Sequence, residues 1–192
     1  VTDFADITNR NDKTLVGSGL GNSSSRGLDL ASGTTGTSSA SLTWRFGDST
    51  NAALFAGSPI FSTMVQMASL DAANGAASAF LGIGAVTVGG AGHTFTVSHI
   101  GFKLIKTGGV VSLYATQADG TTENASAALT TVVNNDILDL ILKVNSTTSV
   151  DYYWRKNGGS LSSATNLTTN LPTALSGHNQ FSVSNDATAF QF

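Results

Sequence analysis

Short segments in which apolar and polar residues alternate constrain the fold of this chain more than any other feature. Between Ile137 and Val144 every second residue is leucine or valine, and Asp139 and Lys143 lie between them. A period of two places the two sets of side chains on opposite faces of a β-strand. The same alternation predicts strands at Ser39–Phe46, Ile60–Leu70, Ile100–Ile105, Val110–Gln117 and Val150–Trp154, with short closing strands at Phe181–Val183 and Ala189–Phe192.

The residues between these segments favour turns and disfavour helix. Glycine occurs 21 times, whereas the only glutamate is Glu123. Glycine destabilises helices and supplies the positive φ that tight turns need. The alanine-rich stretch Ser69–Ala79 is interrupted by Asn74-Gly75, so we expect a loop there with at most one helical turn. We expect Val86–Thr96 to be a long loop or a hairpin tip.

Many short strands separated by glycine-rich turns predict an all-β fold. The expected architecture is an antiparallel two-sheet β-sandwich of the jelly-roll type. Lys106–Val110 and Lys156–Ser160 are expected to form hairpin tips. No linker interrupts the pattern, so residues 1–192 are expected to form a single domain.

The chain carries little charge and no cysteine. Charged residues make up 11% of the sequence, against roughly 25% in an average soluble domain. The basic residues are scattered, so nucleic-acid binding is not expected, and no apolar run reaches the roughly 20 residues that span a bilayer. The opening residues do not have the pattern of a signal peptide, so we expect that one was removed or that the protein is not exported by that route. A Ser-, Thr-, Asn- and Gly-rich exterior repels copies of itself only weakly, so a homo-oligomer is expected.

The order of four motifs after Ile100 points to a known fold family. They are LYATQADGTT (Leu113–Thr122), NNDILDLILKV (Asn134–Val144), VDYYWRKNGG (Val150–Gly159) and TTNLPT (Thr168–Thr173). This order resembles the concanavalin A-like lectin/glucanase jelly roll, in the divergent form found in phage and prokaryotic surface proteins. The resemblance covers about the C-terminal half of the chain. It implies the sandwich fold and leaves the function open.

Catalytic members of that superfamily hydrolyse glycans with paired carboxylates in an E-x-D-x-E arrangement on one strand. A retaining glycosidase needs two carboxyl groups about 5–5.5 Å apart. Here Glu123 has no such partner in sequence, and the spacing of Asp136 and Asp139 places these residues on opposite faces of a strand. The G-x-S-x-G motif of serine hydrolases is also absent. We therefore expect no catalytic residues and no enzymatic activity.

Metal binding has only weak candidates. His93 and His99 are six residues apart and could share a strand face, but they are more simply explained as exposed loop and strand-end residues, and His178 lies far away in sequence. Ca²⁺ is possible because lectins of this fold often hold it on turn oxygens. The weak Ca²⁺ candidates are Asp119, Asn134, Asn135 and Asp136, for which ordinary turn chemistry is the alternative. No cofactor is otherwise expected.

Aromatic residues provide the candidate contacts. The alternation places Trp44 and Trp154 on the core face of their strands, whereas Tyr114 and Tyr153 face outward and Arg155 follows Tyr153. Tyrosine and arginine suit both sugar stacking and contacts between subunits. Tyr114, Tyr153 and Arg155 are therefore the candidate ligand or interface residues.

Low charge, no cysteine and a short-loop sandwich suggest a non-enzymatic virion surface protein. Such a protein would be a phage head decoration, fibre or tail-associated subunit that acts by self-assembly and contacts other virion proteins. One alternative is a glycan-binding, lectin-like module of a secreted or cell-surface protein, and another is an extracellular filament subunit. The expected location is the virion, or alternatively the cell surface or extracellular space. A host surface glycan is a possible partner in either case.

Overall fold

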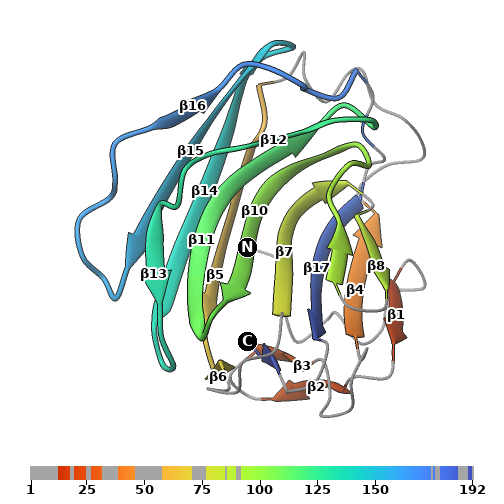
Figure 1. The fold of residues 1–192 in the computed structure, drawn as a ribbon, viewed down its shortest axis with the longest axis vertical. Helices are drawn as coiled ribbons and strands as arrows, with labels where there is room; N and C mark the ends of the chain where they lie inside the picture. The colour runs from red at the N-terminus through yellow and green to blue at the C-terminus, as the bar shows by residue number, and fades with distance from the viewer. Residues whose placement is uncertain are drawn as a thin grey trace.

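The computed structural model describes residues 13–17, 20–24, 27–31, 39–45, 58–70, 77–84, 86–89, 92–173, 175, 178–185 and 190–191. Every regular element in these ranges is a β-strand, and the paired strands are antiparallel (Figure 1). Over the same ranges, nothing helical has the length and apolar character needed to cross a bilayer. The predicted all-β, two-sheet antiparallel sandwich is confirmed.

The sandwich consists of an eight-stranded sheet, called here the large sheet, and a four-stranded sheet, called the back sheet. The large sheet has the order β1 (Lys13–Gly17), β4 (Ser39–Arg45), β17 (His178–Asn185), β7 (Ala77–Gly84), β10 (His99–Thr107), β11 (Val110–Ala118) and β12 (Glu123–Ala125), with β13 (Thr130–Val132) also on β11. The back sheet has the order β16 (Thr165–Leu167), β15 (Ser149–Lys156), β14 (Ile137–Ser146) and β5 (Ile60–Gln66).

Two smaller elements complete the described structure. A further four-stranded sheet lies at one end of the sandwich, at the bottom of Figure 1, in the order β2 (Leu20–Ser24), β3 (Gly27–Ala31), β18 (Phe190–Gln191) and β6 (Ser69–Leu70). A hairpin of β8 (Thr87–Gly89) and β9 (Gly92–Thr94) crosses the large sheet on the side away from the back sheet. It lies against β4, β7 and β17.

The main core fills the space between the large sheet and the back sheet. Alternate residues of β14 are buried in it, as the sequence predicts, and Asp139 and Lys143 point outward. Tyr152 from β15 is fully buried, and its ring meets Phe102 of β10 edge-on at 5.4 Å between centroids. The Tyr152 hydroxyl donates to the Thr116 carbonyl at 3.1 Å, so its polar end is satisfied inside the core. Trp154 packs against this core, which confirms its prediction, whereas the side chain of Trp44 lies outside the described part of the structure.

One prediction made from the sequence is wrong. Ala77–Gly84 is a central strand, although the sequence predicts a loop through Ala79. The strand shows no alternation because every one of its residues is buried.

The segment Lys156–Ser160, expected to be a hairpin tip, begins the connection between β15 and β16, which pair antiparallel. The Gly159 amide donates to the Lys156 carbonyl at 3.0 Å, and β16 begins at Thr165.

A second, smaller apolar cluster lies on the opposite face of the large sheet. Phe80, Val86 and Phe95 form it, with Val97 and Ile105 at its edge. The ring of Phe80 covers the paired residues Gly82 and Gly101, where a Cβ atom would come within 2.8 Å of that ring. The two glycines therefore let an aromatic ring lie close against the backbone of a central strand pair.

Candidate functional site

The candidate site lies on the outer face of the large sheet, which is the face turned away from the back sheet. The β8–β9 hairpin covers this face over β4, β17 and β7. Over β10, β11 and β12, beyond the hairpin, the side chains of Lys103, Tyr114 and Glu123 are partly exposed, and this area is called here the open part of the face. Cross-strand register brings them together because Lys103 pairs with Tyr114 and because Glu123 of β12 pairs with Ala118 of β11.

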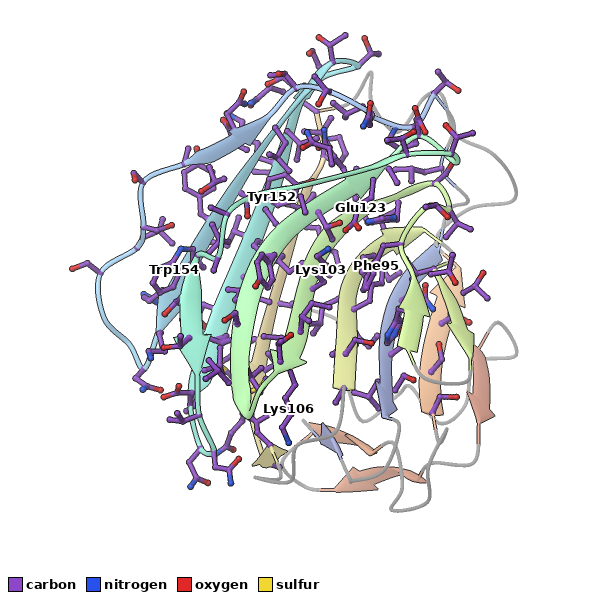
Figure 2. All side chains as sticks on the ribbon, in the orientation of Figure 1. Phe95, Lys103, Lys106, Glu123, Tyr152 and Trp154 are labelled. Carbon is purple, nitrogen blue, oxygen red and sulfur yellow. The ribbon has the colours of Figure 1, made fainter. Side chains whose placement is uncertain are left out.

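Together with Phe95, these three side chains form a compact group, called here the Lys103 cluster. Figure 2 labels three of its members, Phe95, Lys103 and Glu123. The Lys103 ammonium lies 2.5 Å from Glu123 Oε1. It also lies 4.9 Å from the centroid of Phe95 and 5.7 Å from that of Tyr114. Both aromatic contacts are within the range of cation–π attraction. The ammonium is thus held between two rings and a carboxylate.

A buried histidine supports this cluster from beneath. His99 has no exposed surface, and its Nδ1 lies 2.8 Å from the Val97 carbonyl, which can only accept a hydrogen bond. Nδ1 therefore carries the proton, and Nε2 faces Thr116 Oγ1 at 3.0 Å. The Thr116 hydroxyl also lies 2.6 Å from Glu123 Oε1, so its single proton is shared between two acceptors. Burial lowers the pKa of His99 to about 4, which keeps the ring neutral at physiological pH.

His93 joins the β8–β9 hairpin to the sheet below. Its Nδ1 lies 2.7 Å from Ser78 Oγ, and its Nε2 lies 2.7 Å from Ser182 Oγ. Burial lowers the pKa of His93 to about 3. The His93 ring stacks on Phe95 at 5.4 Å between centroids, and Phe95 in turn contacts His99. The interpretation of His93 and His99 as exposed residues is therefore wrong for His99, which is buried, and incomplete for His93, which binds two serines.

The open part of the face can bind a ligand that carries several hydroxyl groups. Both hydrogen bonds to Glu123 end on Oε1, which leaves Oε2 as an acceptor. Lys103 has further N–H donors, and the Tyr114 hydroxyl can donate or accept. The rings of Tyr114 and Phe95 add apolar surface beside these groups. A donor, an acceptor and an aromatic ring side by side are the elements that recognise a polyhydroxylated ring.

The three predicted contact residues do not form one site. Tyr114 lies in the Lys103 cluster on the large sheet. Tyr153 and Arg155 lie on the outer face of the back sheet, on the opposite side of the sandwich. There Arg155 donates to Asp139 Oδ2 at 2.6 Å. Only Tyr114 therefore remains a candidate for the site on the large sheet.

The four weak Ca²⁺ candidates also fall in separate places. Asp119 follows the last residue of β11, whereas Asn134, Asn135 and Asp136 follow β13, which pairs with the opposite end of β11. Hydrogen bonds from the Thr122 amide and from Thr121 hold Asp119 and lower its pKa.

The turn that contains Asp136 is held by its own hydrogen bonds. Burial acts to raise the pKa of Asp136, but the Val133 amide, Asn157 and Lys156 together lower it. Asn134 accepts a hydrogen bond from the Leu70 amide, and Asn135 is exposed with a φ of 69°. Within the described ranges no three His, Cys, Asp or Glu residues gather as a metal site. Ca²⁺ binding stays a prediction, and each aspartate has a structural role as a turn residue.

The sequence pattern does not identify Phe95, Lys103 and Thr116 as members of this site. Phe95 lies in a segment expected to be a loop, and Lys103 and Thr116 are polar positions on strands that the alternation does predict. The alternation assigns Lys103, Tyr114 and Thr116 to outward faces, but it cannot pair their strands. Glu123 becomes part of the site only through the pairing of β12 with β11.

Comparisons with known proteins give structural likenesses only. The sequence matches no family model, and no curated protein aligns with it. Similar solved structures include a legume lectin-like domain from Entamoeba histolytica (7% identity, TM-score 0.49, covering 94% of this chain and 89% of that one). Lectin II from Ulex europaeus (14% identity, TM-score 0.44) covers 95% of this chain and 92% of its own.

A scytalido-glutamic peptidase with a peptide-based transition-state analogue is also similar (12% identity, TM-score 0.45, covering 80% of this chain and 65% of that one). The structures thus include lectin domains of the kind that the sequence resemblance implies.

Proposed function

We propose that this chain is a non-enzymatic binding module that holds a glycan on the open part of the outer face of the large sheet. The observation that carries the proposal is the Lys103 cluster, in which an ammonium, a carboxylate and two aromatic rings lie within contact distance of one another. Tyr114 provides the ring on which a sugar stacks. Lys103 and Glu123 Oε2 provide the donor and the acceptor for its hydroxyls.

Binding rather than hydrolysis fits the surroundings of Glu123. Its carboxylate is held by the Lys103 ammonium and the Thr116 hydroxyl. A glycosidase acid needs a proton at working pH and a second carboxylate nearby. The described contacts of Glu123 are those of a hydrogen-bond acceptor, which suits holding a ligand hydroxyl.

A glycan array tests the proposal with one variant on each sheet. Tyr114→Ala removes the proposed stacking ring, and Tyr153→Ala is the matched control, because Tyr153 is a partly exposed tyrosine on the outer face of the back sheet. We expect the wild-type protein and Y153A to bind the same glycans and Y114A to bind them about tenfold more weakly or not at all. No binding by the wild-type protein, or equal binding by both variants, would contradict the proposal.

A second candidate function, assembly into a larger structure, is supported by the back sheet. Ile60 and Met64 are 65% and 70% exposed on the outer face of β5, and Ile137 is exposed on β14, where it pairs with Gln66 near Met64. Exposed aliphatic side chains on one sheet face suit contact with a second copy of the chain. The role as a virion surface protein and the location in a virion remain predictions. Both require that copies of this chain associate with one another.

A further inference from the structure

The surface beneath the β8–β9 hairpin differs from the main core because it is polar. The hairpin packs on β4, β7 and β17, whose residues on this face include four buried serines and a buried glutamine: Ser41, Ser78, Gln180, Ser182 and Ser184. Two polar atoms here, Gln180 Oε1 and Ser184 Oγ, have no hydrogen-bond partner among the residues that the structure describes. Unpaired buried polar atoms weaken an interface, so this one is less stable than apolar packing would be.

The hairpin is attached at its base and held down by one side chain near its tip. At the base, Val86 and Phe95 are buried against Phe80, and the Gln180 amide donates to the Val86 carbonyl at 2.8 Å. Near the tip, both ring nitrogens of His93 bind serines of β7 and β17. Among the hydrogen bonds of the described residues, loss of the two His93 contacts would leave the hairpin bonded to the sheet at its base, through the Val86 carbonyl.

We propose that the β8–β9 hairpin is a hinged cover over this hydroxyl-lined surface, latched by His93 and released in acid, so that the candidate site then widens toward β17. The widened surface consists of hydroxyl and amide groups and suits the same polyhydroxylated ligand class. That statement about ligands rests on the proposed function, but the movement of the cover does not.

Acid weakens the latch through the cost of burying a charged ring, because the two serine hydroxyls can accept hydrogen bonds from either form of His93. Described side chains that face the ring from β7 and β17 are the uncharged Ser78 and Ser182. Two further titratable groups, His99 and Lys103, lie around the ring of Phe95, on which His93 stacks. Strand β8 has no titratable residue, and the ends of β17 and β4 carry His178 and Arg45, which pair in register with each other. No described carboxylate is therefore placed to stabilise a charged His93.

The sign of the pH effect follows from burial. The pKa of His93 is about 3 under the closed cover, against the ordinary 6.5. Because the closed state disfavours the proton, closure is fully stable above about pH 6.5 and loses stability as the pH falls from 6.5 toward 3. A lifted cover that restores the ordinary pKa would be favoured about 30-fold more at pH 5.0 than at pH 7.5.

Thiol labelling tests the cover without any glycan, because the chain has no cysteine of its own. Ser184→Cys places a thiol on the covered face without removing a hydrogen bond. Val183→Cys, at the next residue of the same strand, places one in the main core, and Ser160→Cys is an exposed reference. Iodoacetamide rates are divided by the S160C rate at each pH, which corrects for the thiolate fraction.

The expected result is a relative labelling rate for S184C that rises about 30-fold between pH 7.5 and 5.0, while V183C stays at least about tenfold slower than S184C. Adding His93→Gln to S184C, which keeps hydrogen-bonding groups but cannot titrate, should abolish the rise. Three results would overturn the proposal: an S184C rate that does not change with pH, equal labelling of V183C, or a rise that survives H93Q. The glycan array decides the proposed function separately.

Discussion

The two outer faces of the sandwich show how the same alternation produces different surfaces. On the back sheet, outward residues such as Met64 and Tyr153 are simply exposed or partly exposed, and Asp139 pairs with Arg155 across neighbouring strands. On the large sheet, outward residues are bonded into a network that includes buried His99, and a hairpin covers part of them. Alternation thus determines which way a side chain points, and the elements above the sheet determine what it does there.

The largest predicted difference between the faces is in their response to acid. His93 and His99 lie over the outer face of the large sheet, with their pKa values lowered by burial to about 3 and about 4. Unfolding restores ordinary values, so stability is full above about pH 6.5 and falls below it. Between pH 6.5 and 5.0 we expect a loss of about 3 kcal/mol. Urea unfolding followed by tryptophan fluorescence measures it.

H93Q is the control for that measurement. The variant should lose about half of the pH-dependent change, because His99 still titrates. A free energy of unfolding that is constant from pH 7.5 to 5.0 would show that the two rings are not buried in the neutral form.

The next largest expected difference between the two sheets is the effect of an added methyl group on stability, because the Phe80 ring lies close against the backbone of the large sheet. Gly101→Ala should destabilise the protein by about 2 kcal/mol, because its Cβ would lie 2.6 Å from the Leu81 carbonyl oxygen and 2.8 Å from the Phe80 ring. Ser62→Ala, at an exposed position of the back sheet, should change stability by less than about 0.5 kcal/mol. Thermal unfolding of the two variants compares them, and equal melting temperatures would exclude the close packing described here.

A smaller difference is expected between the coupling energies of the two ion pairs, one on the outer face of each sheet. The side chains of Lys103 and Glu123 are 12% and 24% exposed, whereas those of Arg155 and Asp139 are 45% and 23% exposed. Double-mutant cycles with K103M/E123Q and R155M/D139N should give couplings of about 1 kcal/mol and less than about 0.5 kcal/mol, respectively. A stronger coupling on the back sheet would reverse the comparison.

The smallest effect on stability is expected at Met64. Because this residue is 70% exposed, Met64→Glu should change the free energy of unfolding by less than about 0.5 kcal/mol. If the back sheet holds a second copy, the same variant should be monomeric where the wild-type protein is not. Light scattering coupled to size exclusion measures both, with Leu161→Glu, at an exposed loop position, as the control. A wild-type monomer at high concentration would contradict the assembly function.

Strand positions were predictable where one face is buried and the other is not, as in β14 and β15. They were not predictable in β7, because its side chains are buried on both faces and the period of two disappears. The site was predictable only at Tyr114. Glu123 and His99 join it through the antiparallel pairing of three strands, which no local pattern specifies.

The central claim is that the open part of the large sheet, and not the back sheet, binds a glycan. A titration of isotope-labelled protein with the tightest glycan of the array, followed by NMR chemical shifts, tests it directly. We expect chemical-shift changes at Lys103, Tyr114, Thr116 and Glu123, and no shift changes in β5, β14 and β15. Changes centred on Tyr153 and Arg155 instead would contradict it.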